Sequence, residues 1–267
     1  MSNWEISQSG ADSPLIRVSN LSLNFENEGV INEVFNDVSF DVFSGEILGI
    51  LGGNGTGKTS LLKAVAGLTN KSGGSIFSAN NSSFSWVPQD YSESFFHWTS
   101  LINNIHFAVS RNVKDLHKQK SCIYAVRDSL KINLDLKLRP SKCSGGMLQQ
   151  AALIRALCND SQVLLADEPF SALDLNIKKT VRRRFREIIK ERGLAAIIIL
   201  HDLEDIASLC DKVLVIPGRP YSSEVKAGME TIRIIPNKKT NFFNLDESIS
   251  ILSVAEQFLS DEENVIS

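Results

Sequence analysis

Apolar and polar residues alternate along the stretch from about residue 15 to residue 43, which is typical of strands with one buried face. Because side chains alternate between the two faces of a strand, each apolar set would line a single face. Two such sets are present: Leu21, Leu23 and Phe25, and then Val38, Phe40 and Val42. We therefore predict an antiparallel sheet in this part of the chain.

Shorter runs that are almost entirely apolar follow, and they are typical of strands buried on both faces. They comprise residues 47–51, 85–87, 163–166, 196–200 and 213–216. The run at 85–87 is expected to be a second central strand. Helical patterns at residues 60–66 and 149–157 lie between these runs, and Gly67 is a suitable helix end. This alternation of strands and helices predicts a parallel core sheet.

Residues from about 92 to 142 have a different character, with a mixed polar and amphipathic sequence and no clear buried strand. We expect a mostly helical insertion there. Beyond Pro220 the pattern is weak and the chain ends in acidic residues, so no role is assigned to this tail. The sequence contains no internal repeat and no low-complexity block.

The composition suits one large α/β domain, alone or with a small sub-domain. The chain has 267 residues and a mass of 29.5 kDa, with 43% hydrophobic and 22% charged residues. Its formal net charge of -3 and its pI of about 5.9 do not indicate a general affinity for nucleic acid or anionic lipid. These values do not exclude a local basic patch on the surface.

The cysteines and the distribution of apolar residues further restrict the class of protein to which the chain can belong. Cys122, Cys143, Cys158 and Cys210 form no Cys-x-x-Cys pair, which favours reduced thiols over a zinc site or a disulfide framework. Residues 1–12 are polar and lack the apolar core of a secretory signal. No apolar run approaches the roughly 18–20 residues that span a bilayer. If the protein acts at a membrane, we therefore expect it to do so by docking onto another chain.

A glycine-rich loop connects the run at 47–51 to the helical pattern at 60–66. It fits G-x-x-x-x-G-K-[ST] at every fixed position: Gly52, Gly53, Asn54, Gly55, Thr56, Gly57, Lys58 and Thr59. Glycines let backbone N–H groups approach phosphate oxygens, and the helix start adds a positive dipole end. Lys58 would supply charge to the β- and γ-phosphates, and Thr59 a hydroxyl to Mg²⁺. A chance match does not account for the flanking strand and helix, but the loop alone fits kinases, GTPases, motors and recombinases equally.

An acidic pair, Asp167 and Glu168, ends the apolar run at 163–166. Such sheets place their ligand sites at strand ends beside the phosphate loop. Asp167 would hold Mg²⁺ through its water shell, and Glu168 would orient the water that attacks the γ-phosphate and accept its proton. The alternative is a solvated strand end with two incidental acids.

Residues 143–147 read Cys-Ser-Gly-Gly-Met and precede an alanine-rich helix that ends Ile-Arg-Ala-Leu. This resembles the Leu-Ser-Gly-Gly-Gln signature of ATP-binding-cassette (ABC) ATPases and the helix that follows it. Further matches occur in the family's order: Phe25 as the adenine-stacking aromatic, Gln89 as the Q-loop glutamine, residues 171–174 (Ser-Ala-Leu-Asp) as the D-loop, and His201 as the switch histidine. Phe25 could equally be plain sheet core. Two positions depart from the pattern, because Cys143 replaces leucine and Gln150 replaces arginine.

The resemblance implies an α/β fold, namely a P-loop NTPase core with an antiparallel N-terminal β sub-domain and a helical sub-domain at about 92–160. We expect this ABC ATPase domain to cover residues 15–220. The terminal segments, 1–14 and 221–267, are of unknown role.

The resemblance also implies that two ATP molecules bind between two copies of the chain, or between the chain and a second cassette. The implied nucleotide-binding residues are the phosphate loop through Ser60, with Phe25, Gln89, Ser144, Gly145, Gly146 and Asp174. Lys58 and Thr59 of one copy and Ser144 and Gly146 of the other would enclose each ATP. The implied Mg²⁺ residues are Thr59, Gln89 and Asp167, and the implied catalytic residues are Glu168, His201 and Lys58.

The implied function is ATP hydrolysis that powers a membrane transporter from the cytoplasmic face of the inner membrane. An integral membrane permease and an extracytoplasmic solute-binding protein are the expected partners. Residues 95–99, Asn104-Ile105, Met147 and Arg219-Pro220 resemble the branch that takes up nitrate, sulfonates and taurine. Residues 89–107 carry Tyr91, Phe95, Phe96 and Trp98 and are expected to receive the permease. Alternatively, these rings pack inside the helical sub-domain.

Other functions are possible within the same superfamily. One is a soluble, non-transport ATPase acting in DNA repair or translation, and another is a nucleotide-binding module that no longer hydrolyses ATP. A basic groove would favour the first, but the chain offers one cluster, Arg182, Arg183, Arg184 and Arg186. We interpret that cluster as a solvated helix face. The presence of both Glu168 and His201 argues against the second.

Overall fold

The computed structural model describes residues 13–27, 30–79, 84–109, 116–216 and 233–236. The first sheet is antiparallel and has three strands in the order β2-β1-β4. Its strands are β1 (Ile16–Asn27), β2 (Val30–Val42) and β4 (Gly73–Ser78). The predicted antiparallel sheet is confirmed. The sequence did not indicate β4, whose two leading glycines weaken the strand pattern.

The second sheet has six strands in the order β5-β6-β7-β3-β8-β9. Their bounds are β3 (Ile47–Gly52), β5 (Phe84–Val87), β6 (Val163–Asp167), β7 (Ala195–Ile199), β8 (Lys212–Ile216) and β9 (Arg233–Pro236). All neighbouring pairs are parallel except β8 and β9. The parallel core sheet is confirmed, but the prediction that residues 85–87 form a central strand is wrong. Strand β5 lies at the edge, where only alternate side chains are buried. Strand β9 lies in the tail to which the sequence assigned no role.

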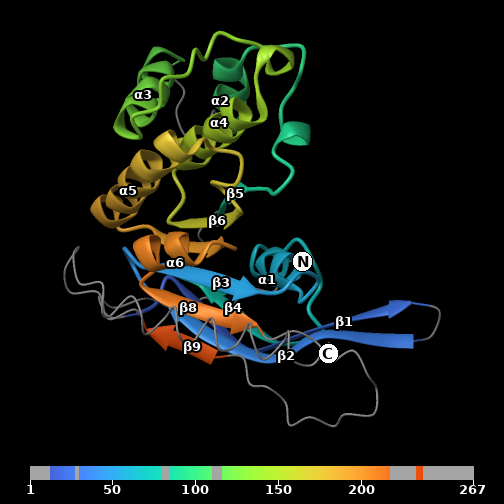
Figure 1. Ribbon diagram of the computed structural model, residues 1–267. Coiled ribbons are helices and arrows are strands. Elements are labelled where there is room, and N and C mark those ends of the chain that lie inside the picture. Colours follow the sequence, from blue (N-terminus) through green and yellow to red (C-terminus); the bar gives the residue numbers. More distant parts are fainter. Residues whose placement is uncertain (1–12, 28–29, 80–83, 110–115, 217–232, 237–267) are drawn as a thin grey trace.

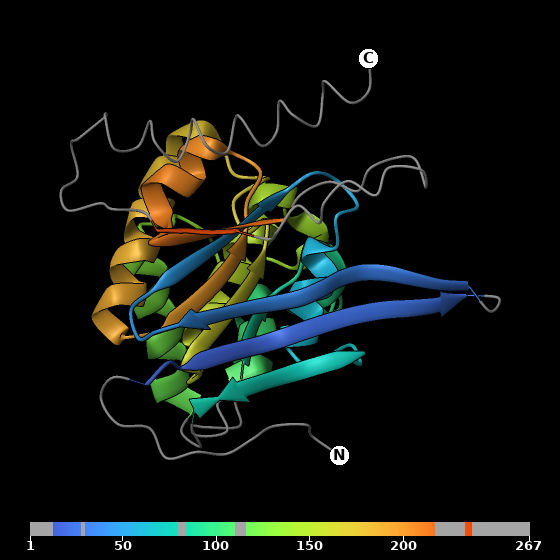
Figure 2. The same ribbon diagram turned by 90° about the horizontal axis from the view of Figure 1, so that it is seen from below.

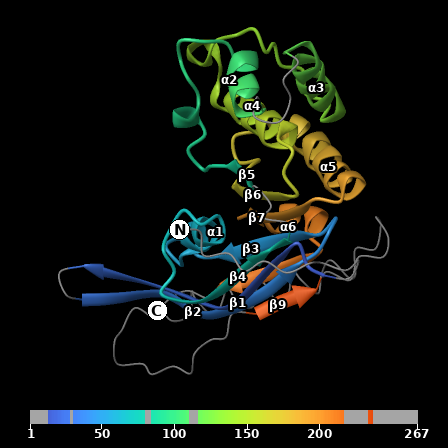
Figure 3. The same cartoon turned by 180° about the vertical axis from the view of Figure 1, so that it is seen from behind.

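Several helices lie on the side of the core sheet away from the antiparallel sheet (Figures 1 and 3). They are α2 (Leu101–Val109), α3 (Leu116–Ser129), α4 (Gly145–Cys158), α5 (Leu175–Arg192) and α6 (Leu203–Leu209), with 3-10 turns η2 (Ser92–Ser94) and η3 (Pro140–Lys142). Helices α2 and α3 pack on α4 and lie beyond it from the core sheet, which confirms a helical insertion in this part of the chain. None of the described helices is long and apolar enough to cross a membrane.

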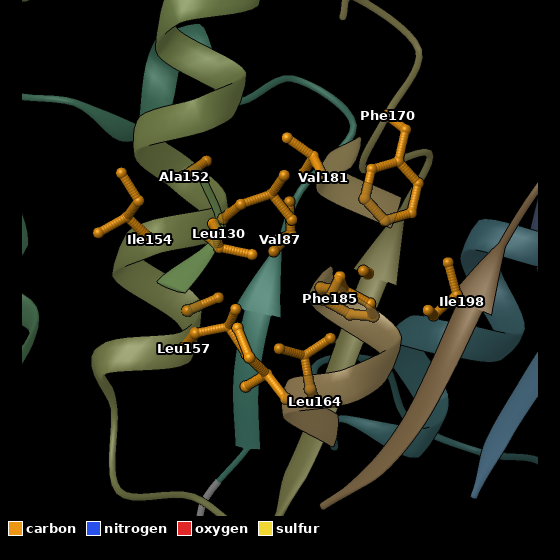
Figure 4. Close-up of a cluster of buried hydrophobic side chains, with 14 of the residues drawn as sticks. Val87, Leu130, Ala152, Ile154, Leu157, Leu164, Phe170, Val181, Phe185 and Ile198 are labelled. Atoms are coloured by element: carbon orange, nitrogen blue, oxygen red, sulfur yellow. The ribbon is translucent and has the colours of Figure 1, made fainter. Parts of the chain in front are cut away.

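Two hydrophobic cores lie on opposite faces of the core sheet. Because side chains alternate along β7, Ile197 and Ile199 face the antiparallel sheet, and Ile198 faces the helices. On the helical side Phe170 meets Phe185 edge to face at 5.5 Å between ring centroids (Figure 4). Helix α1 (Lys58–Val65) packs into the other core. Figure 2 shows the β1-β2 hairpin extending beyond the core sheet.

The arginine cluster on α5 does not form a solvated face. Arg182 and Arg186 are only 7% and 8% exposed. Arg182 pairs with Asp205 of α6, and Arg186 bonds Asp211 at 2.6 Å. The interpretation of these two residues as solvated was wrong because α5 packs against α6, which supplies Asp205, and Asp211 lies just beyond that helix, between α6 and β8. Arg183, in contrast, is exposed.

Candidate nucleotide-binding site

The phosphate loop joins β3 to α1 at the carboxyl end of the core sheet. Gly57 is the residue before α1 and has a φ of 95°, a left-handed conformation that favours glycine. A Cβ atom there would come within 2.5 Å of Val34 Cγ1. The left-handed backbone and the close approach of Val34 both explain why glycine occupies this position. The amide of Leu61 then donates to the Gly57 carbonyl at 2.8 Å, and the helix begins.

Lys58 already lies within the loop that would hold a phosphate. Its side chain is 7% exposed, and its Nζ donates to the carbonyl oxygens of Gly52 at 2.8 Å and Gly53 at 2.6 Å. Thr56 also bonds the Gly53 carbonyl, at 3.1 Å. These contacts fix a positive charge among backbone groups in a partly buried place, where an anion would be held strongly.

Thr59 and Asp167 form a hydrogen-bonded pair between α1 and the end of β6. The Thr59 hydroxyl donates to Asp167 Oδ2 at 2.7 Å. The other carboxylate oxygen, Oδ1, is buried and has no hydrogen-bond partner among the described residues. Burial raises the pKa of the Asp167 carboxyl; the Thr59 bond opposes this shift, and the neighbouring Glu168 adds to it. A hydroxyl beside a carboxylate with an orphaned oxygen fits Mg²⁺, which prefers oxygen ligands.

The Glu168 side chain contacts two other predicted site residues, His201 and Gln89. Its Oε1 lies 2.7 Å from Nε2 of His201 and accepts a hydrogen bond from Nε2 of Gln89 at 3.2 Å. Its own backbone is left-handed, with a φ of 49°, which is uncommon for a residue other than glycine. Three side chains that are distant in sequence thus converge at the ends of neighbouring strands, next to the Thr59–Asp167 pair.

The signature residues lie at the start of α4, in the helical layer. Ser144 is exposed and caps this helix, because its hydroxyl accepts from the Met147 amide at 3.3 Å. Gly146 packs on the D-loop so closely that a Cβ would come within 2.6 Å of the Ala172 carbonyl oxygen. In Figures 1 and 3, α4 and α1 lie on opposite sides of β5 and β6. The exposed Ser144 and Gly145 are therefore presented at the surface, away from the core of their own chain.

The remaining predicted residues are at the surface. Phe25 is 48% exposed near the end of β1, so the alternative that it is plain sheet core is wrong. Its stacking on adenine stays a prediction. Asp174 precedes α5 and is also exposed. In the phosphate loop, Asn54 and Gly55 are exposed, and Thr59 and Ser60 are half-buried.

Sequence reasoning missed Gln149, which was counted only as a helix residue. This side chain is 1% exposed and bonds the main chain of Glu168 and Ala172. The one signal available was the pair of polar residues Gln149 and Gln150 before an apolar stretch of α4. That signal does not say which partner the amide meets.

Three comparisons with known proteins agree with this geometry. The family model described as "ABC transporter" matches residues 35–171. The sulfate/thiosulfate import ATP-binding protein CysA 2 of Agrobacterium fabrum is 37% identical over 212 residues, covering 75% of this chain and 60% of that protein. The corresponding CysA protein of Yersinia pestis is 30% identical over 214 residues, covering 75% and 57%. The chain thus spans about 60% of the length of these relatives.

Solved structures give the same fold. The dimeric structure of MJ0796, described as a bacterial ABC transporter cassette, has a TM-score of 0.68 at 19% identity and covers 75% of this chain and 94% of that one. The structure of an ATP-binding subunit of an ABC transporter has a TM-score of 0.66 at 22% identity and covers 76% and 85%. At these identities the likeness concerns the fold.

Proposed function

The chain belongs to the ABC transporter family, and we propose that it is the ATP-hydrolysing subunit of a transporter that takes up a small solute. The observation that carries this proposal is the group formed by Glu168, His201 and Gln89 beside the Thr59–Asp167 pair. Such a group contains a base for water, a donor for a phosphate and oxygen ligands for a cation. A module that only bound nucleotide would not need the base.

Binding of ATP would use the phosphate loop. The loop amides and Lys58 Nζ surround the β- and γ-phosphates, and Lys58 exchanges its bonds to the Gly52 and Gly53 carbonyls for bonds to phosphate oxygens. Thr59, Asp167 and the amide oxygen of Gln89 would hold Mg²⁺, which when bound neutralises developing phosphate charge. Phe25 would stack on the adenine from near the end of β1.

Hydrolysis would depend on Glu168 as the base. Its carboxylate accepts the proton of the attacking water, and the bond from His201 fixes its direction. When ATP is bound, the His201 Nε2–H would exchange its bond to Glu168 for one to the γ-phosphate. Because His201 and Gln89 share one oxygen of Glu168, a change at either is transmitted to the base.

The signature residues would act on a second copy or a related cassette. Ser144 and Gly145 are exposed and, with the half-buried Gly146, form a helix start, which favours an anion. ATP held by one copy would bind this surface of the other and favour the closed dimer through contacts that the open state lacks. Hydrolysis removes those contacts and reopens the dimer.

The permease would dock on an exposed aromatic cluster, which we define as Phe96, Trp98 and Phe107. These side chains are 46%, 72% and 53% exposed. Their rings contact one another, with centroids 4.8 Å apart for Phe96 and Trp98 and 6.0 Å for Phe96 and Phe107. An exposed group of this kind is typical of interaction sites. The prediction that all of 89–107 is such a surface needs correction, because Phe95 is 3% exposed and Tyr91 packs on the core.

The aromatic cluster is held rigidly and is connected to the signature helix. Buried Asn104 accepts from the Phe96 amide at 2.7 Å and donates to the Phe96 carbonyl at 3.1 Å. Arg155 of α4 donates to both the carbonyl and the hydroxyl of Ser94 at 2.7 Å and lies 4.5 Å from the centre of the Phe95 ring. Movement of α4 would therefore reach the docking surface through Ser94 and Phe95.

For the solute we propose a small oxyanion or sulfonate. The relatives are named for sulfate and thiosulfate import, whereas residues 95–99 and Met147 resemble the nitrate, sulfonate and taurine branch. Small solutes carrying a sulfur or nitrogen oxyanion group cover both. Uptake would also need a permease and an extracytoplasmic solute-binding protein, with this chain on the cytoplasmic face of the membrane.

Two measurements test the proposal. The purified chain should release phosphate from ATP when Mg²⁺ is present and lose that activity when the ion is chelated. Cells that lack the chain should take up less radiolabelled sulfate, thiosulfate, nitrate or taurine, and unlabelled solute should compete in the parent strain. Absence of ATP hydrolysis by the intact chain together with its permease would contradict the proposal. Normal uptake of all four solutes would contradict the solute assignment alone.

A further inference from the structure

Gln149 is a buried amide of α4 that bonds both ends of the turn following β6. Its Nε2 donates to the carbonyl oxygen of Glu168 at 3.0 Å and to the hydroxyl of Ser171 at 3.2 Å. Its Oε1 accepts from the Ala172 amide at 2.8 Å. One side chain, 1% exposed, thus spans residues 168–172.

This turn contains a conformation that needs support. Glu168 has a φ of 49°, and such a backbone persists only where its surroundings hold it. The Glu168 amide donates to the Ile199 carbonyl at 3.2 Å, so the strand side is fixed by β7. The carbonyl side is held by Gln149 at 3.0 Å and by the hydroxyl and the amide of Ser171 at 3.1 Å and 3.3 Å. Gln149 therefore fixes the peptide that determines where the Glu168 carboxylate points.

The same turn is in contact with the start of α4. Gly146 lies one helical turn before Gln149 and packs on the Ala172 carbonyl, where a Cβ would come within 2.6 Å. The signature end of α4 and the backbone of Glu168 are thus linked within one chain by a tight packing contact and a shared amide. A displacement of the signature helix would move the base.

We propose that Gln149 is a positioning residue, which holds the backbone of Glu168 and the D-loop so that the Glu168 carboxylate faces the attacking water. It acts through Glu168 and does not touch the nucleotide. This inference rests on the proposed function, since it assigns a role in ATP hydrolysis by the same site.

The substitution Gln149→Met tests it, because methionine has nearly the same shape and lacks both polar groups. We expect kcat for ATP hydrolysis to fall about tenfold or more, while the affinity for ATP changes less than about twofold. Gln150→Met is the matched control, since Gln150 is the next residue of α4 and is also buried; its kcat should stay within about twofold of the unmodified chain.

A double substitution separates positioning from general stability. In a Glu168→Gln background, Gln149→Met should lower the residual rate by less than about twofold, because the group it positions is already gone. An equal loss in both backgrounds would overturn the proposal, and so would an unchanged kcat. If Gln149→Met does not fold, Gln149→Glu removes the donors to the Glu168 carbonyl and to Ser171 while it keeps an acceptor for the Ala172 amide, and an unchanged kcat there also overturns the proposal.

Hydrogen exchange tests the role of Gln149 without relying on the enzymatic activity. In nucleotide-free protein the Ala172 amide should exchange about tenfold faster in Gln149→Met than in Gln150→Met. Equal exchange in the two variants would overturn the proposal. If the unmodified chain hydrolyses no ATP, the proposed function fails, and exchange at Ala172 still decides whether Gln149 holds the turn.

Discussion

Nε2 of His201 lies 2.7 Å from Oε1 of Glu168. The two residues are 33 positions apart, and they meet because β6 and β7 are parallel neighbours whose carboxyl ends lie at one edge of the sheet. The contact joins a proton acceptor to a side chain that can donate to a phosphate. It is the relationship from which the proposed chemistry follows.

Replacing His201 with alanine should therefore lower the hydrolysis rate without preventing ATP binding. We expect kcat to fall about tenfold or more, because Glu168 loses the bond that orients it. His201→Gln retains a hydrogen-bond donor and should lose less. Steady-state phosphate release and calorimetric binding check this, and an alanine variant with full kcat would contradict the orienting role.

Asp167→Asn should separate stability from function. Burial raises the pKa of Asp167 above its usual 3.8, so the folded chain binds this proton more tightly than the unfolded chain does. The stability contributed by the group is then fully present below pH 3.8 and is lost as the pH rises through the folded-state pKa. Asparagine removes the buried charge, so at pH 7 the nucleotide-free variant should melt about 2–4 °C higher for each kcal/mol gained.

The same variant should hydrolyse little ATP, because the amide is a poor ligand for Mg²⁺. Its advantage in Tm over the unmodified chain should shrink as the pH falls toward 4. Asp160→Asn, at an exposed position, is the control for a change of charge alone. A lower Tm at pH 7 for Asp167→Asn would show that its charge is well solvated or paired.

Lys58→Ala should weaken ATP binding by about 10²-fold, since it removes a charge-assisted bond to phosphate from a partly buried site. Lys63→Ala is the control, because Lys63 lies on the same helix and is exposed. Titration calorimetry with Mg²⁺ present measures both affinities. Equal affinities in the two folded variants would rule out the phosphate assignment of the loop.

Changing Phe96 and Trp98 to alanine should abolish co-purification with the permease. Both rings are largely exposed, so Tm and the ATPase rate of the isolated chain should change little. Phe95→Ala is the contrasting variant, because Phe95 is 3% exposed and its truncation should cost about 3–5 kcal/mol. A Phe96→Ala/Trp98→Ala protein that melts early and still binds the permease would contradict the docking surface.

The sequence predicted those parts of the site whose residues are neighbours in a short segment of the chain. The loop from Gly52 to Thr59 is set by local backbone geometry, and the Asp167–Glu168 pair is set by a strand end. Each can be recognised from neighbouring residues alone. The general plan of the fold was accessible for the same reason, since hydrophobic alternation is a local property.

What the sequence did not predict depends on partners distant along the chain. The roles of Gln149 and Arg182 depend on which carbonyl or carboxylate lies opposite each side chain. The hydrophobic periodicity of a helix does not identify that partner. Strand β5 reads as central because its residues are apolar, but its place at the edge follows from strand order. Phe25 fits a strand pattern, yet it lies near the end of β1 and is 48% exposed.

The most direct test of the account is the oligomeric state of Glu168→Gln with Mg²⁺ and ATP. The amide keeps the shape of the site but cannot accept the proton, so hydrolysis should fall roughly 10²–10⁴-fold while ATP binding persists. ATP bound by the phosphate loop of one copy and the signature of another would then hold the closed state. Size-exclusion chromatography should show an ATP-dependent dimer that Ser144→Arg abolishes. A monomer with normal turnover would contradict both the base and the shared nucleotide site.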